Sequence, residues 1–370
     1  MSSSASRCRL CGGALREVLD LGVLPLVNSF PREGRGADDP RFPLVLATCA
    51  TCAHWQLRDA LPPATLFPPT YPFRAGASAG WHTHAARLAA EVTQSRDVVW
   101  EIGSNDGTLL RACLAHGASW GLGIDPAAAS PDLPTEERPW GFESAGALLD
   151  LYPRPDLILA TNVLAHIPDP HAVFAGCARV LTRDGRVVVE TPWVEAMLVR
   201  GDYATIYHEH LHYWSLGALD RVATQYGLQV QQVTYPEVHG GSLRVVFTRQ
   251  GHGPEIGMAR PELHVRDLKG AVVSFGVARE EAERSIHDLR PPAYGFCASA
   301  RGVVRLHHER GLADRLHGVF DDTPEKQGCR MAGTDLRVLP PGDMAGVGSL
   351  VVLSEPWHAQ VQARYPGLVA

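Results

Sequence analysis

The sequence predicts an α/β protein built on a Rossmann-like sheet, and two observations carry this prediction. Apolar runs typical of buried strands alternate with helical stretches between residues 98 and 190. Such alternation is typical of a parallel sheet with right-handed crossovers. In addition, the first of these runs leads into a loop of small and turn-forming residues before a helix begins. A strand, a tight turn and a helix in this order form the core of many nucleotide-binding folds.

The loop at residues 103–107 is the first candidate site. Gly103 and Gly107 allow a sharp turn and a close approach to a ligand, and the helix from residue 108 directs free N–H groups at it. Alone, the loop could equally be an ordinary strand–helix turn. A second run at residues 120–124 ends at Asp125, where an acid can bond ribose hydroxyls. The candidate cofactor residues are Glu101, Gly103, Asn105, Asp106, Gly107 and Asp125.

The remaining pattern extends this architecture along the chain. Further strands are expected at residues 138–142, 156–162 and 187–190, and an antiparallel pair at 229–234 and 243–247. Helices are expected at 79–92 and 169–181, and from Ser215. A mostly helical stretch at 254–289 precedes a second strand–turn–helix at 291–302 and strands at 319–322 and 349–353.

Length and composition restrict the class of protein. At about 150 residues per domain, 370 residues suggest two or three domains, which we place at 1–70, 71–253 and 254–370. A net charge of −6 argues against a broad nucleic-acid surface or an anionic membrane partner. The sequence contains neither an apolar run of about 20 residues nor a signal-peptide core behind its first residues. We therefore expect a cytoplasmic protein.

Two C-x-x-C pairs near the N-terminus predict a structural metal site. Two tight turns that supply two thiolates each complete a closed tetrahedral shell for zinc, formed here by Cys8, Cys11, Cys49 and Cys52. A pair of disulfides is disfavoured in a cytosolic chain, and redox chemistry would need only one such pair. A four-thiolate shell leaves no open position, so this zinc should hold the fold together. We interpret His54 as a neighbour of the site.

A proline-rich connector at residues 61–72 leads from this module toward the central sheet. Its prolines exclude a regular helix. A segment that enters the nucleotide domain here could form a lid, and Tyr71 is the candidate residue for a substrate contact. Packing of the same aromatic ring against the connector is an equally good interpretation.

The richest polar cluster lies at residues 203–213, with three His, one Glu and three Tyr. Its spacing does not match the usual zinc-binding helix, and a solvated loop is the plainest alternative. Acid–base chemistry is the stronger interpretation, because histidine exchanges protons near neutral pH and a nearby carboxylate can orient it. Asn162 and His166 follow a buried strand at the edge where ligands bind in such sheets.

Six segments, taken together, carry a family resemblance. They are the two cysteine pairs, Glu101-Ile-Gly-Ser-Asn-Asp-Gly107, Asn162-Val-Leu-Ala-His166, Tyr207-His-Glu-His210 and His239-Gly-Gly-Ser-Leu-Arg244. In this order the chain resembles S-adenosylmethionine-dependent sugar C-methyltransferases, which add a branching methyl group to nucleotide-linked deoxyketosugars in antibiotic biosynthesis. The resemblance spans nearly the whole sequence. It implies a class I methyltransferase-type central sheet, an N-terminal zinc module and a C-terminal α/β domain that closes over the substrate.

The resemblance also implies roles for individual residues. Glu101 and Gly103 would border the methionine part of S-adenosylmethionine, with Asp125 on its ribose. Tyr207, Glu209, His210 and His166 match the family's active-site residues. The family's substrates are nucleotide-diphosphate 4-keto sugars, usually linked to thymidine diphosphate, and Asn162 would touch the base. Lys326, in a D-x-x-x-K-Q-G pattern, would meet the diphosphate as a point charge, although a surface lysine is an equal alternative.

These roles suggest a mechanism in which His210 removes a proton beside the ketone, with His166 as the less favoured base. Tyr207 would stabilise the enolate oxygen and Glu209 would orient His210. Two alternatives stay open: methylation of a non-sugar ketone or an oxygen, and a catalytically silent zinc-bearing binding protein. The sequence departs from the family where Phe296, Arg301 and Ala332 replace a small residue, a lysine and a proline, which puts the diphosphate contacts in question.

Overall fold

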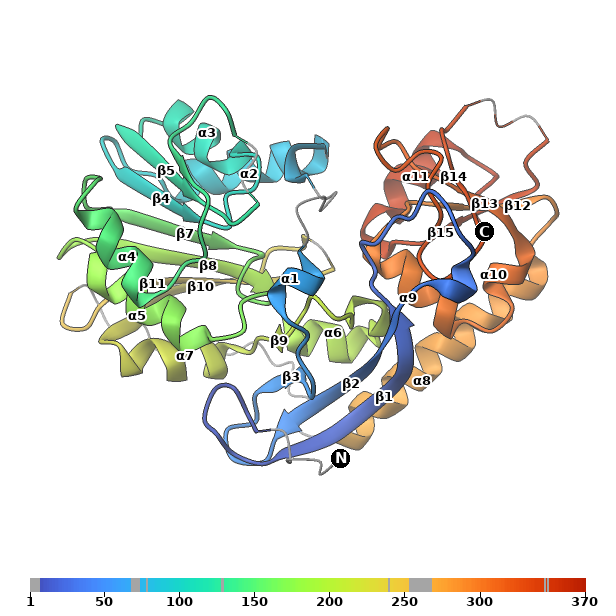
Figure 1. Cartoon of the computed structure of the whole chain (residues 1–370), viewed down its shortest axis with the longest axis horizontal. Coiled ribbons are helices and arrows are strands. Elements are labelled where there is room, and N and C mark those ends of the chain that lie inside the picture. Colours follow the sequence, from blue (N-terminus) through green and yellow to red (C-terminus); the bar gives the residue numbers. More distant parts are fainter. Residues whose placement is uncertain are drawn as a thin grey trace.

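In the computed structural model, three sheets organise the chain (Figure 1). The structure describes residues 7–67, 74–77, 79–127, 130–238, 240–252, 268–342, 344 and 346–370. The central sheet has seven strands, and the other two sheets have four strands each. In the described part of the chain, no helix has the length and apolar character needed to cross a membrane.

The central sheet has the order β10-β11-β8-β7-β4-β5-β6, and all its strands except β11 point the same way. Every residue of β7 is buried, as expected of a strand covered on both faces. The antiparallel pair expected near residue 240 is present as β10 and β11. The strands are β4 (Val98–Ile102), β5 (Trp120–Ile124), β6 (Thr135–Glu136), β7 (Leu157–Thr161), β8 (Arg186–Pro192), β10 (Leu228–Thr234) and β11 (Ser242–Arg249).

Helices cover both faces of this sheet (Figure 1). On one face, α2 (Ala79–Val92) and α3 (Thr108–Ala115) pack on alternate residues such as Val99 and Leu159. The opposite face, which includes Trp100 and Ile158, is covered by α4 (Phe142–Leu149), α5 (Pro170–Val180) and α7 (Leu216–Gln225). Asp169 and Ser215 cap α5 and α7, as their positions before apolar periodic stretches suggest.

The expected strand at residues 138–142 is wrong. Thr135 and Glu136 fill the edge of the sheet instead, pairing with Gly123 and Ile124 of β5. Trp140 is buried, and its indole nitrogen donates to the carbonyl of Val173 in α5, after which α4 begins at Phe142. An apolar side chain packed by a tertiary contact therefore accounts for the pattern that suggested a strand.

The N-terminal sheet has the order β1-β2-β3-β9 and includes a strand from much later in the chain. Its first three strands are β1 (Leu15–Pro25), β2 (Arg41–Cys49) and β3 (Trp55–Leu57). The fourth, β9 (His212–Tyr213), forms the end of the polar cluster. In the proline-rich connector the structure contains one helical turn, α1 (Pro63–Leu66), with a proline where the first turn tolerates it.

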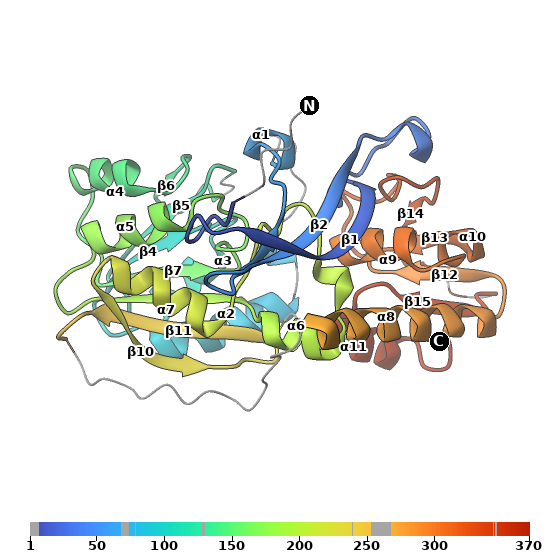
Figure 2. The same ribbon diagram turned by 90° about the horizontal axis from the view of Figure 1, so that it is seen from below.

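The C-terminal sheet is parallel, with the order β14-β13-β12-β15. Its strands are β12 (Ala293–Phe296), β13 (Leu316–Phe320), β14 (Val338–Leu339) and β15 (Ser349–Val352). Its helices are α8 (Leu268–Ser285), α9 (Ala300–His308), α10 (Leu312–Arg315) and α11 (His358–Arg364). The β1–β2 hairpin shares an apolar core with this region and with α6 (Val194–Arg200), so it joins the two α/β parts (Figures 1 and 2).

Candidate active site

Backbone geometry explains the glycines of the loop after β4. Gly103, Asn105 and Gly107 have φ angles of 72°, 50° and 76°, in the left-handed region. A Cβ on Gly103 would lie 2.6 Å from Cγ2 of Val163, which belongs to the loop after β7. The two loops therefore meet closely at the carboxyl edge of the sheet, where ligands bind in α/β folds.

Glu101 presents a buried carboxylate at this edge. Its side chain is 3% exposed, and Oε2 has no hydrogen-bond partner within the described part of the chain. Burial, reinforced by the charges of Asp106 and Asp125, raises the pKa of Glu101 well above its ordinary value. A cationic ligand group beside it would offset the cost of ionisation. The ammonium group of a bound amino acid moiety carries the positive charge that this requires.

Asp125 follows β5 and faces the same loop. Its Oδ2 accepts the backbone N–H of Asn105 at 2.9 Å, and its Oδ1 accepts that of Ala127 at 2.7 Å. These bonds orient the carboxylate and still leave each oxygen a second lone pair. A ribose hydroxyl could therefore donate to it, as the sequence predicts.

Asn105 and Asp106 hold the segment that precedes α2. Asn105 Oδ1 accepts the N–H of Ala75 at 3.0 Å, and Asp106 Oδ2 accepts that of Gly76 at 2.6 Å. The other oxygen of Asp106 accepts the N–H and the hydroxyl of Thr108 at the start of α3. Asp106 thus links Gly76 to the loop at residues 103–107 through its side chain. Tyr71, the expected lid residue, lies outside the described residues.

Tyr207 and His210 form a hydrogen-bonded pair in the polar cluster. The phenol of Tyr207 lies 2.6 Å from His210 Nε2, and His210 Nδ1 lies 3.0 Å from the carbonyl oxygen of Thr205. Because a carbonyl only accepts, Nδ1 carries the proton and Nε2 is the basic nitrogen. Burial, with the charge of Glu209 adding to it, raises the pKa of Tyr207, so its phenol remains protonated.

His166 and Asn162 approach this pair from the loop after β7. The His166 ring lies 5.0 Å from that of His210, and its Nδ1 donates to the Glu209 carbonyl at 2.8 Å. Burial lowers the pKa of His166 from 6.5 to about 4, so it is neutral at pH 7. Asn162 has a φ of 53°, and its buried Oδ1 has no partner among the described residues. These residues link the cofactor loop to the Tyr207–His210 pair.

Glu209, which is expected to orient His210, and His210 itself each have a further hydrogen-bond partner. Thr205 orients His210 through its carbonyl, as described above. The carboxylate of Glu209 accepts hydrogen bonds from the Asn28 amide at 2.9 and 2.8 Å. Asn28 belongs to the N-terminal module and lies 181 residues away, so no local pattern points to it.

The other two histidines of the cluster bind the N-terminal module. His208 Nε2 donates to the carbonyl of Phe42 at 3.1 Å, and His212 Nδ1 lies 2.9 Å from Nε2 of His54. Both are buried, as is His54. Only His210 of the three thus has a described contact with Tyr207, and His54 connects the module to β9.

The four N-terminal cysteines converge as the spacing predicts. The ligand atoms of Cys8, Cys11, Cys49 and Cys52 all lie within 4.8 Å of one another. Backbone N–H groups of Leu10 and Thr51 point at two of the sulfurs, at 3.4 and 3.3 Å, which suits thiolates. These residues would hold a zinc ion that supplies structural cross-linking. Cys113, Cys177 and Cys329 are buried elsewhere, as expected of core residues.

The C-terminal candidates have protein partners of their own. Lys326 Nζ donates to the carbonyl of Ala298 at 2.7 Å and lies 3.7 Å from Asp321 Oδ2. Arg301, which replaces the family's lysine, forms an ion pair with Asp202, just before the polar cluster. Phe296 packs away from that cluster, against Tyr365 with a ring distance of 5.5 Å. Its bulk therefore enters the core of the C-terminal sheet.

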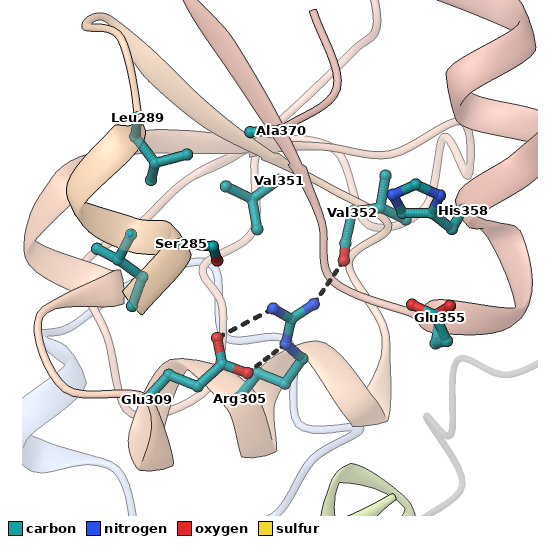
Figure 3. Close-up of a pocket in the computed structure, with 10 residues that line it drawn as sticks. Ser285, Leu289, Arg305, Glu309, Val351, Val352, Glu355, His358 and Ala370 are labelled. Carbon is teal, nitrogen blue, oxygen red and sulfur yellow. Dashed lines mark hydrogen bonds and ion pairs between the residues drawn. The ribbon is translucent and has the colours of Figure 1, made fainter. Parts of the chain in front are cut away.

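A cavity of about 150 Å³ lies within the C-terminal part (Figure 3). Its lining includes Arg305 and Glu309, which form an ion pair, and none of the candidate site residues. The hydroxyl of Tyr203 donates to Glu309 at 2.7 Å, which fixes the start of the polar cluster against α9. This cavity is therefore separate from the candidate active site. The hydrogen bond from Tyr203 to Glu309, which lines the cavity, connects the two regions.

Comparison with known proteins agrees with this geometry. Residues 77–233 match a family model described as "Methyltransferase domain", and residues 8–67 match one described as "Putative zinc binding domain". The C-methyltransferase NovU of Streptomyces niveus is 30% identical over 365 residues, which cover 92% of this chain and 86% of NovU. The fold and the matched domain define a class I methyltransferase that uses S-adenosylmethionine. The chain belongs to the C-methyltransferase family that includes NovU, and it is an enzyme with zinc as a second cofactor.

Solved structures similar to the chain are methyltransferases or related proteins that match about half of it. The YcgJ protein of Bacillus subtilis has a TM-score of 0.36 and 16% identity, over 46% of this chain and 100% of that one. Magnesium protoporphyrin IX methyltransferase of Synechocystis, solved with bound SAH, has a TM-score of 0.34 and 16% identity, over 45% and 81%.

Proposed function

We propose that this enzyme methylates a carbon next to the ketone of a nucleotide-diphosphate 4-keto-deoxysugar, in branched deoxysugar and antibiotic biosynthesis. Thymidine diphosphate is the proposed nucleotide and the cytoplasm the proposed location. The 30% identity with a C-methyltransferase over nearly the whole chain supports carbon as the acceptor. The proposal also assigns residues 1–70 to the zinc module, 71–253 to cofactor binding and 254–370 to closure over the substrate.

The pairing of Tyr207 with His210 is the observation that carries the proposal. A carbon acceptor needs a base, because its C–H bond must ionise before it can accept a methyl group. In this site the basic Nε2 of His210 is buried, and its tautomer is set by the Thr205 carbonyl. An oxygen acceptor would need less activation than this arrangement provides.

In the proposed reaction His210 Nε2 accepts the proton from the carbon beside the ketone. Tyr207 donates its hydrogen bond to Nε2 in this structure, so the phenol must turn toward the ketone oxygen when substrate binds. Its raised pKa keeps the phenol protonated, as a donor to the developing enolate requires. His166, neutral and 5.0 Å from the His210 ring, is the less favoured base.

The residues present suit S-adenosylmethionine, which supplies an electrophilic methyl group when bound. Glu101 would face its ammonium, Gly103 would allow its close approach, and Asp125 would hold its ribose hydroxyls. Asn105 N–H is bonded to Asp125, so the loop and this carboxylate are held together before ligand arrives. Much of the rate would come from holding the two substrates in near-attack geometry.

The substrate would lie between the central and C-terminal parts. Asn162, with its buried side-chain oxygen, is the proposed contact to the base. Lys326 and Arg301 are cations on the C-terminal side of this space, each with a described carboxylate neighbour. A diphosphate entering here would compete with Asp321 or Asp202 for them. We therefore propose that Arg301 must give up its ion pair with Asp202 when it binds the diphosphate.

The test combines methyl transfer with proton exchange. The enzyme is incubated in deuterated water with S-adenosylmethionine and a thymidine-diphosphate 4-keto-deoxysugar, and mass spectrometry and NMR follow the sugar. A new carbon-bound methyl group is expected. An oxygen-bound methyl group, or neither methyl transfer nor deuterium exchange with any keto sugar tried, would contradict the proposal.

The base is tested by substitution of the two histidines. His210→Ala should lower kcat by about 10²–10⁴-fold, because a general base contributes that much. His166→Asn should lower it less if His166 only supports the site. The measurements are kcat and the rate of deuterium exchange without S-adenosylmethionine. A His210→Ala enzyme that keeps more than about a tenth of kcat would remove His210 from this role.

A further inference from the structure

The carboxylate of Glu209 is held by a residue of the zinc module. Asn28 Nδ2 donates to both carboxylate oxygens, at 2.9 Å and 2.8 Å. Glu209 is only 2% exposed, so water cannot replace these hydrogen bonds. A buried carboxylate is costly to keep ionised without donors, and donors to both oxygens favour the charged form.

We infer that Asn28 is a positioning residue of the active site, which keeps the Glu209 carboxylate ionised and oriented beside the catalytic histidines. This inference rests on the proposed role of Glu209. Asn28 acts through Glu209 and need not touch the substrate. The zinc module thereby takes a direct part in the active site in addition to its structural role.

The surroundings of Glu209 explain why its charge matters. The Glu209 carbonyl orients His166, and the Glu209 charge acts on Tyr207, the partner of His210. When His210 takes up a proton, a nearby anion stabilises the resulting cation. Other charged groups near the site are Asp202 before the cluster, Arg301 on α9 and Lys326 after β13.

The loop that carries Asn28 is firmly anchored on its other side. Beside it, the Phe30 ring lies 5.3 Å from Lys326 Nζ. Farther along, the Arg330 N–H donates to the carbonyl of Pro31 at 2.7 Å, and the Arg330 guanidinium pairs with Asp39 at 2.8 Å. Arg330 is itself 2% exposed. A loop clamped between two α/β parts can hold the Asn28 amide in one place, as positioning requires.

The first experiment compares Asn28→Ala with Ser29→Ala, an exposed neighbour in the same loop. Asn28→Ala should lower kcat about ten- to a hundred-fold, the size of effect that misplaced catalytic groups produce. The KM for S-adenosylmethionine should stay unchanged. The acid limb of the kcat–pH profile should move to higher pH, because Glu209 loses the two hydrogen bonds from Asn28 that favour its ionised form. Ser29→Ala should behave as wild type.

A double-mutant cycle separates positioning from general damage. If Asn28 acts through Glu209, Asn28→Ala should have little further effect on kcat in a Glu209→Ala enzyme. Additive losses in kcat, or an acid limb that does not move in Asn28→Ala, would overturn the inference.

A substrate-free measurement distinguishes failure of this inference from failure of the proposed function. With ¹³C-labelled glutamate, the carboxyl signal of Glu209 is assigned by its absence in Glu209→Gln and titrated by NMR in the full chain. Asn28→Ala should raise the midpoint relative to wild type and Ser29→Ala. An unchanged midpoint would overturn the inference even if the sugar is methylated. A raised midpoint would support it even if the acceptor proves different.

Discussion

Glu101 combines a cost to the fold with a proposed role in cofactor binding. Its carboxylate is buried and its pKa is raised well above the ordinary value by desolvation. The folded chain therefore holds a proton that the unfolded chain has released, and stability falls as pH rises from 4.5 through the raised pKa. Such strain is tolerated where a ligand later relieves it.

Glu101→Gln should therefore stabilise the ligand-free enzyme at pH 7 while weakening cofactor binding. We expect about 1–3 kcal/mol more stability, since a glutamine at this position folds without the proton uptake that the buried Glu101 carboxyl needs at pH 7. Binding of S-adenosylmethionine should weaken about ten- to a hundred-fold through loss of a charge-assisted hydrogen bond. Urea unfolding and calorimetric titration measure the two effects, with exposed Glu137→Gln as the control. Unchanged cofactor affinity would remove Glu101 from the binding site.

At the scale of elements, the loops after β4 and β7 are packed so closely that only a glycine fits where they meet. Gly103 has a φ of 72° and no room for a Cβ beside Val163. Gly227, between α7 and β10, has a φ of 70° but nothing within 4 Å of where a Cβ would lie. The two positions therefore share the backbone strain and differ in the steric contact.

Gly103→Ala should cost more than Gly227→Ala, although both suffer the same left-handed strain. We expect about 1 kcal/mol of destabilisation at Gly227 and a further 1–3 kcal/mol at Gly103 from overpacking. Only Gly103→Ala should weaken S-adenosylmethionine binding, by about tenfold or more. Equal losses of stability at the two sites, or intact cofactor binding in Gly103→Ala, would contradict the predicted contact between the loops.

At the scale of the whole molecule, the zinc module is built into the rest of the chain. Strand β3 follows the second cysteine pair and hydrogen-bonds to β9, the end of the polar cluster. His54 contacts His212 across the same boundary, and His171 of α5 contacts the Leu10 carbonyl at 2.9 Å. Loss of the metal should therefore reach the active site.

Zinc removal by a chelator should lower stability and kcat together, and added zinc should restore both. We expect Tm to fall by about 10 °C, since each kcal/mol shifts Tm by roughly 2–4 °C in larger domains and structural zinc contributes several kcal/mol. Cys49→Ser should reproduce the effect, whereas Cys113→Ala, on the buried face of α3, should leave metal content unchanged. Full kcat in metal-free enzyme would contradict this coupling.

Two partly buried, neutral histidines should make the stability of the whole molecule sensitive to mild acid. Burial lowers the pKa of both His166 and His308 from 6.5 to about 4. Between pH 4 and pH 6.5 the unfolded chain binds more protons than the folded chain. The stability that the two neutral histidines contribute is therefore complete above pH 6.5 and is lost as the pH falls toward 4. Tm should already fall between pH 7 and pH 5, and less steeply in His308→Gln. A constant Tm over this range would contradict these burial effects.

Much of the architecture could be predicted because it depends on local patterns. The strands around Glu101, Asp125 and Asn162 and the helices after them appear where apolar runs and caps indicate. The short strands β3 and β9 escaped prediction, since two or three residues contain too little periodicity to detect. Their pairing depends on partners far away in the sequence.

The candidate site divides in the same way. Tyr207, His210 and His166 are drawn together as their motifs suggest, because short segments at the carboxyl edge of one sheet must converge there. The contact of Glu209 with Asn28 could not be predicted, since Asn28 comes from the zinc module, and the role of Glu209 toward His210 stays a prediction. Nothing in the eleven residues of the cluster distinguishes the role of His210 from those of His208 and His212.

The sequence by itself determined the α/β class, the convergence of the four cysteines and the position of the cofactor loop. Each depends on short-range spacing and on the alternation of apolar residues, which act through local backbone geometry. Tertiary structure alone decided which residues hold His208 and His212, which amide holds Glu209 and where Phe296 packs. These outcomes depend on burial and on hydrogen bonds between distant segments, because a buried polar group must find its partner wherever the fold brings one.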